Sequence, residues 1–386
     1  MKITIIGAGP AGLYFAVLMK KADPSHTITV FERDGADDTF GWGIVFSDHT
    51  FAYLEHSDPP SFHDIIAARQ TWDNVDVVHR GEKISIHGNR FSGIARIAFL
   101  KILQRRAAAL GVDLRFHTPY VSVAELEPYD LLVGADGANS QIRREHAGVF
   151  GPEVSAARNK YIWLGTPRLF HGLTLTFRET QWGPFAAHAY KFSPTLSTFI
   201  VECGPDAWAR AGFASMTEAE TCERLAAVFR DDLKGEPLLT NNFVRWLNFT
   251  LVRNRRWWSE RVVLLGDALH TAHFSIGSGT KLALEDAIAL AKAFAERGEV
   301  AEALPYFQSQ RKPVVDATQD AALESLRWFE NMGEDFGLDP IVFAYRLMTR
   351  SGRLDKEKLR RRDKSFVEAY ERAVGVSPIG PPRTGV

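Results

Sequence analysis

The sequence predicts an α/β fold in which a parallel-sheet domain is interrupted by an antiparallel sheet and followed by a C-terminal helical segment. Three observations support this prediction. A glycine-rich turn separates the first apolar strand from a helix, and two later apolar strands end in an Asp-Gly or a Gly-Asp pair. The stretch between those two strands contains short aromatic and β-branched runs, which are typical of antiparallel strands.

The composition is that of an ordinary globular protein and argues against several classes of function. The 386 residues suffice for two or three domains, and 46 basic against 47 acidic residues give a formal net charge of −1. This balance predicts no nucleic-acid partner and no membrane association, and the sequence lacks an apolar run of about 18 residues. The cysteines, Cys203 and Cys222, are too few for a disulfide framework and lack metal-ligand spacing. We therefore expect a cytoplasmic protein without a metal.

The N-terminal turn has the spacing of a dinucleotide-binding βαβ unit. A β-rich run over 2–6 precedes the turn 7–12, and a second apolar run over 27–31 ends in Glu32. The glycines permit a tight turn, close approach of the backbone to a pyrophosphate, and close helix–strand packing. The helix N-terminus offers free N–H groups to that pyrophosphate, and Glu32 can accept hydrogen bonds from the ribose hydroxyls. The candidate cofactor residues in this unit are Gly7, Gly9, Ala11, Gly12, Glu32 and Arg33.

Two later segments each place an acid beside a glycine where a strand ends. An apolar strand over 129–133 leads into Asp136-Gly137, and another over 261–265 leads into Gly266-Asp267. Open α/β sheets bind their ligands beyond the carboxyl ends of the strands. We therefore expect both acids at the same nucleotide site as the N-terminal turn.

In this order the three segments resemble the para-hydroxybenzoate hydroxylase family of FAD-dependent monooxygenases. The resemblance implies a Rossmann-like FAD-binding domain, in which Asp136 supports the FAD pyrophosphate and the reduced nicotinamide, and Asp267 hydrogen-bonds the ribityl chain. Arg96 matches the family's arginine that opens a helix and contacts FAD. A late helix, expected from about Leu282 to Arg297, would stabilise negative charge on the reduced flavin through its dipole. The cofactor residues implied are Gly41, Trp42, Arg96, Asp136, Gly137, Gly266, Asp267, Gly277, Gly279, Thr280 and Lys281.

The stretch 151–251 differs in character from its surroundings and predicts an inserted substrate domain. Its aromatic and β-branched runs suggest an antiparallel sheet, which the resemblance implies would cover the flavin ring. The expected domains are a discontinuous FAD-binding domain over 1–150 and 252–330, a substrate domain over 151–251 to which part of 40–95 contributes, a C-terminal helical segment over 331–373, and a loose tail over 374–386.

Several stretches resemble one subgroup of this family in particular. They are residues 40–48, 163–166, 187–192 with 197–202, and 343–363. The subgroup contains enzymes that hydroxylate salicylyl-CoA, 2-aminobenzoyl-CoA and an intermediate of violacein biosynthesis. Because the sequence ends at Val386, before the second half of the bifunctional members, we expect a stand-alone salicylyl-CoA 5-hydroxylase that forms gentisyl-CoA.

The resemblance also implies the course of the reaction. NADH or NADPH would reduce FAD, O2 would add at flavin C4a to give a hydroperoxide, and hydroxyl would pass to the aromatic ring. Carbon 5 of a salicylyl thioester lies para to the phenol oxygen, so removing the phenol proton would activate that carbon. His188 and Tyr190 share one face of a predicted strand and are the candidate catalytic residues. A packed strand histidine is the alternative for His188.

Four further residues are candidates for binding the substrate. Tyr161 and Trp163 share one face of another predicted strand, which would lie over the ring. Arg360 and Arg362 belong to a dense run of basic residues that would suit the phosphates of CoA. An ordinary solvated helix face is the alternative for that run.

Other functions are compatible with the same motifs. The ring could belong to 2-aminobenzoyl-CoA or to an indole or tryptophan derivative, and a non-catalytic FAD-binding protein could keep the fold. A flavin halogenase is disfavoured because a Trp-x-Trp-x-Ile-Pro segment is absent from the sequence. The expected partner is a small aromatic substrate, most simply a CoA thioester, and the expected assembly is a monomer or a homodimer.

Overall fold

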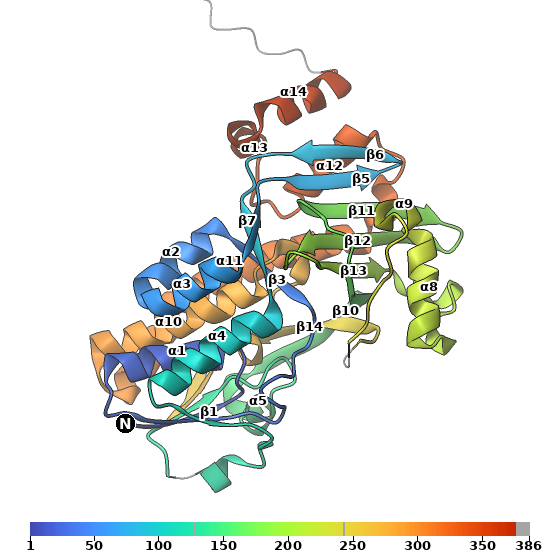
Figure 1. The fold of residues 1–386 in the computed structure, drawn as a ribbon. Helices are drawn as coiled ribbons and strands as arrows, with labels where there is room; N and C mark the ends of the chain where they lie inside the picture. The colour runs from blue at the N-terminus through green and yellow to red at the C-terminus, as the bar shows by residue number, and fades with distance from the viewer. Residues whose placement is uncertain (127, 242–243, 376–386) are drawn as a thin grey trace, which may run out of the picture.

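The computed structural model describes residues 1–126, 128–241 and 244–375, except for the side chains of Asp48 and His49. The described residues form three sheets with helices packed against them, which confirms the predicted mixed α/β fold (Figure 1). Most of the predicted tail, residues 376–386, lies outside the described part of the chain.

The first sheet has six strands, and its central strands are parallel. The strand order is β15-β16-β9-β1-β2-β8, in which β15 runs antiparallel to β16. Strands β9 and β16 are completely buried apolar runs, as is usual in parallel sheets. The strands are β1 (Lys2–Ile6), β2 (Thr27–Phe31), β8 (Asp113–Arg115), β9 (Leu131–Gly134), β15 (Trp258–Ser259) and β16 (Val262–Leu264).

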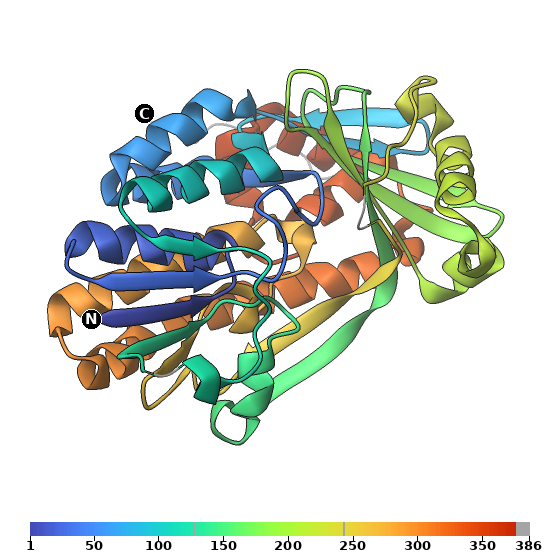
Figure 2. The ribbon, with the colours of Figure 1, turned by 60° about the horizontal axis from the view of Figure 1, so that its bottom comes forward.

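Three helices that pack side by side belong to this part of the molecule (Figure 2). They are α1 (Pro10–Ala22), α4 (Arg96–Ala109) and α10 (Gly279–Arg297), with α1 in contact with both of the others. The sequence placed the start of α10 three residues too late, at Leu282. Ser278 is the residue that flanks the helix, so Gly279 and Thr280 already belong to its first turn.

The second sheet has seven strands in the order β14-β10-β13-β12-β11-β5-β6. Two of these strands, β5 and β6, come from the segment 40–95, and β5 pairs with β11 in parallel. The long strand β10 has a register shift between Ala156 and Lys160. The strands are β5 (Val75–His79), β6 (Glu82–Ile86), β10 (Pro152–Thr166), β11 (Leu173–Thr180), β12 (Gly183–Lys191), β13 (Ser197–Cys203) and β14 (Leu247–Asn254).

The two faces of this second sheet have different neighbours. Alternate apolar residues such as Ile162, Phe185 and Phe199 form a core with the helices that cover one face. These helices are α7 (Pro205–Arg210), α8 (Glu218–Val228) and α9 (Arg230–Leu233). The other face meets a small antiparallel sheet of β3 (Gly43–Ser47), β7 (Phe91–Ala95) and β4 (Gln70–Trp72).

The helix α11 (Val300–Glu330) connects the two halves of the molecule. Its 31 residues correspond to about 46 Å of helix. Phe307 and Val315 belong to the core around the first sheet, whereas Phe329 belongs to a separate core that includes Phe177 of the second sheet.

No helix in the described ranges has both the length and the apolar character needed to cross a bilayer.

The remaining helices are shorter. They are α2 (Asp48–Ser57), α3 (Pro59–Ala68), α5 (Gln141–Glu145), α6 (Ala147–Phe150), α12 (Pro340–Thr349), α13 (Lys356–Arg362) and α14 (Lys364–Ala373).

Candidate active site

The three motif segments meet at one edge of the six-stranded sheet, because β1, β9 and β16 are neighbours and each precedes one motif. Gly7 has a φ of +107°, and a methyl group on it would lie 2.2 Å from the carbonyl oxygen of Ala135. A methyl group on Gly12 would lie 2.2 Å from the carbonyl oxygen of Gly7, and one on Gly266 would lie 2.9 Å from Cβ of Ala11. The glycines therefore allow three turns to pack against one another in a space that side chains would fill.

The N-terminus of α1 faces open space. A methyl group on Gly9 would meet no protein atom within 4 Å, although its neighbours in the turn are tightly packed. The Glu32 carboxylate lies beside this turn and accepts hydrogen bonds from the N–H groups of Ala8 at 2.8 Å and Asp34 at 3.1 Å. Arg33 points outward and pairs with Asp34 at 3.3 Å. This arrangement suits a pyrophosphate at the helix N-terminus and a ribose beside Glu32.

A pair of interacting charged residues, Asp267 and Arg96, belongs to the same region. The side chain of Asp267 is exposed, yet protein surrounds it closely enough that burial raises its pKa above the usual range, against the opposing effect of Arg96. Burial lowers the pKa of Arg96, and its Nε is a buried atom without a hydrogen-bond partner among the described residues.

Asp136 is held differently from Asp267. One of its carboxylate oxygens, Oδ2, accepts a hydrogen bond from the N–H of Gln141 at 2.7 Å, at the start of α5. The other, Oδ1, is buried and lacks a partner within the described ranges. The unpaired buried polar atoms on Arg96 and Asp136 fit the presence of a polar cofactor within reach of each. The residues that would hold FAD are Gly9, Glu32, Arg96, Asp136, Gly137 and Asp267.

The turn 41–43 packs directly against the second sheet through reciprocal tryptophan–glycine contacts. The Trp163 ring covers Gly41, which has a φ of +86°. A methyl group on Gly41 would lie only 2.8 Å from that ring and would clash with it. The Trp42 ring covers Gly165 in the same way, because a methyl group on Gly165 would lie 2.8 Å from the ring of Trp42. Trp42 and Trp163 therefore fix this turn against β10, at the border between the two sheets. Their indole N–H groups are buried without a described partner.

The loop 273–279 enters the same region from the opposite side and leads into α10. The Phe274 ring lies 5.1 Å from that of Tyr161 and 5.3 Å from that of His188. Gly277 has a φ of +61°, which turns the chain toward the first turn of α10, where Thr280 lies. The ammonium group of Lys281 lies 3.4 Å from the Glu285 carboxylate, so its charge is directed along the helix.

His188 lies at the centre of this face of the second sheet. Its ring is 5% exposed and lies between Phe274 and Phe329, whose ring is 4.9 Å away. Its Nε2 lies 2.8 Å from Oε1 of Glu202 on the neighbouring strand. A carboxylate at this distance places a proton on Nε2 and leaves the lone pair on Nδ1. No described residue forms a hydrogen bond with Nδ1. His188 thus has the arrangement of a general base that is oriented by a second residue.

Three further titratable or charged groups lie near His188, and the sequence did not predict that they would meet it. Glu202 is completely buried, and burial acts to raise its pKa, but the hydrogen bond from His188 and the neighbouring polar groups outweigh burial and keep the pKa below the usual range. Burial lowers the pKa of His273 to about 4 and that of Arg350 to about 10. Arg350 donates hydrogen bonds to the hydroxyl of Ser325 at 2.8 Å and to the carbonyl oxygen of Ser275 at 2.6 Å.

A metal site is absent from the described residues, which contain no suitable group of His, Cys, Asp and Glu.

Tyr190 faces the small antiparallel sheet. Its hydroxyl donates a hydrogen bond to the carbonyl oxygen of Gly43 at 2.8 Å, and its ring stacks on Trp72 at 5.9 Å. Burial raises its pKa far above the usual range, so the hydroxyl stays protonated. This contact explains Tyr190 as a structural residue and gives its candidate catalytic role no support.

We expect Tyr190→Phe to lower the free energy of unfolding by about 1 kcal/mol, because the buried carbonyl of Gly43 loses its donor. Hydroxylation should stay within about twofold of the wild-type rate, since the ring and its packing remain. Urea denaturation of the FAD-bound protein and a turnover assay measure the two effects. A large loss of turnover at normal stability would restore the catalytic role.

Comparisons with known proteins agree with this geometry. The profile of the FAD binding domain family matches residues 129–322, and that of the NAD(P)-binding Rossmann-like domain matches residues 5–51. The chain is 43% identical to a salicyloyl-CoA 5-hydroxylase of a Streptomyces species, over 96% of this chain and 73% of that enzyme. It is 38% identical to a 3-hydroxy-4-methyl-anthranilyl-[aryl-carrier protein] 5-monooxygenase of Streptosporangium sibiricum, over 86% of this chain and 90% of that enzyme.

A solved structure shows the same fold at lower identity. The tetrameric form of 2-methyl-3-hydroxypyridine-5-carboxylic acid oxygenase superposes with a TM-score of 0.70 at 19% identity, covering 95% of this chain and 98% of that one. The motifs, the site that they form and the two relatives agree, and the chain therefore belongs to the family of FAD-dependent aromatic monooxygenases.

Proposed function

We propose that this monooxygenase hydroxylates carbon 5 of an aromatic acyl thioester, with salicyloyl-CoA as substrate and gentisyl-CoA as product. The observation that carries the proposal is the 43% identity to a salicyloyl-CoA 5-hydroxylase over 96% of the chain. The second relative carries a 5-monooxygenase name for an anthranilyl group on an aryl-carrier protein. In both cases carbon 5 lies para to an electron-donating group that is ortho to the acyl carbonyl.

The residues of the second sheet fit this chemistry. FAD, once reduced by NADH or NADPH, supplies the activated oxygen. Tyr161 and Trp163 would form an aromatic wall for the ring, and Phe274 closes the opposite side and helps to exclude water. His188 would accept the phenol proton at Nδ1, so that the phenolate directs electron density to carbon 5. The carbonyl group withdraws electron density, which is why removal of this proton should matter.

The proposal is tested by following NADH and NADPH oxidation with salicyloyl-CoA, salicyloyl-pantetheine, 2-aminobenzoyl-CoA, free salicylate and indole, with products identified by mass and by ring position. Salicyloyl-CoA should stimulate oxidation most strongly and gain one oxygen at carbon 5. Equal stimulation by free salicylate would show that the thioester is not recognised. A response to salicyloyl-pantetheine equal to that of salicyloyl-CoA would show that the nucleotide of CoA contributes little.

An anthranilyl thioester is the second candidate, favoured by the relative from Streptosporangium sibiricum. An amine donates electron density without losing a proton, so this substrate needs a base less than a phenol does. The two candidates differ in their dependence on His188. Turnover of 2-aminobenzoyl-CoA by a His188→Ala variant should fall much less than turnover of salicyloyl-CoA.

The candidate CoA-binding arginines have partners within the chain. Arg360 donates a hydrogen bond to the Glu371 carboxylate at 2.6 Å, and Arg362 donates one to the side-chain oxygen of Asn89 at 2.8 Å. Figure 1 shows α13 and α14 beyond β5 and β6, so these contacts attach the C-terminal helices to the edge of the second sheet. The structure supports a structural role for both arginines, and their binding of CoA stays a prediction.

We expect Arg360→Glu to lower the free energy of unfolding by about 2 kcal/mol, because the buried Glu371 carboxylate loses its strongest partner and gains a like charge. The KM for salicyloyl-CoA should stay within about twofold. Arg361→Glu changes the net charge equally at an exposed position and is the matched control. A tenfold rise in that KM at unchanged stability would instead place Arg360 at the CoA phosphates.

A further inference from the structure

Polar residues on one face of the second sheet lead from His188, beside the proposed position of the substrate ring, toward the surface. Cross-strand neighbours share a face of a sheet, and so do residues two positions apart on one strand. By this rule His188, Glu202 and Asn159 lie in three successive rows of the same face. The first row is His188, Ile200 and Trp163, and the second is Ala186, Glu202 and Tyr161. Continued one step beyond the last paired residues, the third row is Pro184, Gly204 and Asn159, which all line one cavity.

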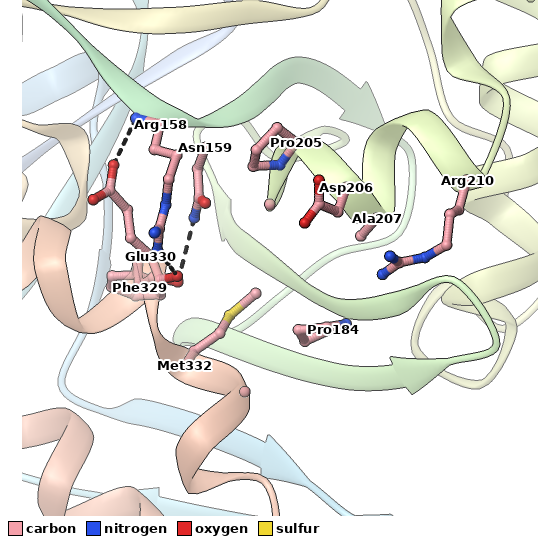
Figure 3. A pocket seen from close by; sticks show the side chains of 12 residues that line it. Arg158, Asn159, Pro184, Pro205, Asp206, Ala207, Arg210, Phe329, Glu330 and Met332 are labelled. Atoms are coloured by element: carbon pink, nitrogen blue, oxygen red, sulfur yellow. Dashed lines mark hydrogen bonds between the residues drawn. The ribbon is translucent and has the colours of Figure 1, made fainter.

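The third row lines a cavity of about 270 Å³ between the sheet and the end of α11 (Figure 3). Its rim includes the exposed side chains of Arg158 and Arg210, and its floor includes the buried Asn159 and Phe329. The Asn159 amide donates a hydrogen bond to the carbonyl oxygen of Phe329 at 3.3 Å. A water molecule takes up about 30 Å³ in the liquid, so the cavity has room for several waters in contact with solvent.

Glu202 lies between this cavity and His188. Its Oε1 is engaged with His188, whereas Oε2 is completely buried and has no hydrogen-bond partner among the described residues. The side-chain oxygen of Asn159 is also buried without a described partner, and Asn159 is near enough to lower the pKa of Glu202. Buried polar atoms in proteins almost always have a partner, ordered water included. Two such atoms near a cavity with room for several waters point to ordered water within reach of both.

We propose that Glu202 passes the phenol proton from His188 to water in this cavity, which makes the cavity the proton exit of the hydroxylation site. The phenol proton moves to Nδ1 of His188, and the proton on Nε2 moves to Oε1 of Glu202. The protonated carboxyl group then rotates so that this proton faces the cavity, and the proton passes to water beside Asn159. Reprotonation of the product phenolate runs the same transfers in reverse and restores the original tautomer of His188. This inference rests on the proposed function, because it needs a substrate that loses a proton.

The charges around Glu202 are suited to this role. The titratable or charged groups that face it are His188 on β12, His273 on the loop before α10, and Arg350 at the end of α12. The lowered pKa of Glu202 makes it a carboxylate at rest, which can receive a proton and lose it again. Burial keeps His273 neutral, so Arg350 is the cation that balances the carboxylate.

The test uses FAD-bound protein without NADH or NADPH, mixed rapidly with salicyloyl-CoA in weakly buffered solution. Phenolate absorbance reports ionisation at the site, and a pH indicator dye reports proton release to solvent. Glu202→Gln keeps the shape of the side chain but removes its charge. Gly204→Leu places a side chain in the cavity, because the backbone there is extended and the nearest atom to a methyl group is Asn159 Oδ1 at 3.9 Å. Gly337→Leu, at an exposed glycine with open space around it, is the control.

We expect Glu202→Gln and Gly204→Leu each to slow phenolate formation and proton release at least tenfold, with the dissociation constant of the substrate within threefold of wild type. Gly337→Leu should behave as wild type. In steady state the two variants should lower kcat and leave KM nearly unchanged. Proton release at the wild-type rate in both variants would overturn the exit through the cavity.

One further variant separates the failure of this inference from that of the proposed function. If His188→Gln abolishes phenolate formation while Glu202→Gln and Gly204→Leu leave it intact, the relay is wrong and the proposed base stands. If wild-type protein forms no phenolate, or if His188→Gln forms it normally, the proposed base is wrong and the relay fails with it.

Discussion

Replacing His188 with alanine is expected to reduce hydroxylation of salicyloyl-CoA by at least about 100-fold, because a positioned general base contributes roughly 10²–10⁴-fold to a rate. The FAD content should stay normal, since His188 lies on the second sheet and away from the three turns that would hold the cofactor. Product formation, measured per NADH or NADPH oxidised, reports the coupled reaction. Flavin absorbance after gel filtration reports the FAD content.

Two comparisons make this result specific. His171→Ala removes an exposed histidine that precedes β11 and should leave the coupled rate unchanged. His188→Ala also leaves the buried Glu202 carboxylate without its partner, so some loss of stability is expected and should be measured by urea denaturation. Unchanged coupled turnover in a well-folded His188→Ala protein would remove this histidine from the reaction.

Gly9→Ala is expected to weaken FAD binding roughly 10- to 100-fold without disturbing the fold. A methyl group at Gly9 meets no protein atom within 4 Å, and its backbone has a φ of −75° and a ψ of 177°, which alanine adopts readily. The same methyl group would occupy the space in front of α1 where a pyrophosphate approaches. Loss of one hydrogen bond to a charged group corresponds to about 1.5–3 kcal/mol. Titration of the apoprotein with FAD measures the affinity.

Two other glycines are matched controls for this prediction. Gly12→Ala places a methyl group 2.2 Å from the carbonyl oxygen of Gly7, so it should lower the free energy of unfolding by about 2 kcal/mol or more. Gly148→Ala adds a methyl group in open space and should change neither FAD affinity nor stability. Full FAD affinity in the Gly9→Ala protein would mean that the pyrophosphate lies elsewhere.

The parts of the site that depend on backbone geometry could be predicted from the sequence. The turns at Gly7, Asp136 and Gly266 each follow a recognisable apolar strand, and strands of a parallel sheet present their carboxyl ends at one edge. Their meeting therefore follows from local patterns together with one rule of topology. The inserted sheet was also predictable, because its aromatic and β-branched runs are typical of strands. The sequence did not reveal that β10 begins at Pro152, since the first residues of this strand alternate weakly.

The partners of the site residues could not be predicted, because they depend on register between strands and on distant segments. Glu202 meets His188 only because β12 and β13 pair with one particular register. A single acid in the apolar run of β13 was a usable signal, since buried strands seldom carry one unpaired. Arg350 reaches Ser275 across 75 residues, and no local pattern marks that contact. The basic run near Arg360 suggested a ligand, whereas a nearby acid neutralises that arginine.

The helix α11 limits how the two sheets can move relative to each other. Because Phe307 lies in one core and Phe329 in the other, the sheets cannot swing apart unless this helix bends or one of the cores opens. Pro305 and Pro313, the positions where a helix bends most easily, both lie in its first half, before the crossing to the second core. Under the proposed function, an acyl thioester would therefore enter by local movement of short segments and not by a hinge between the domains. The shared helix also ties the stability of each half to that of the other, which favours unfolding as one cooperative unit.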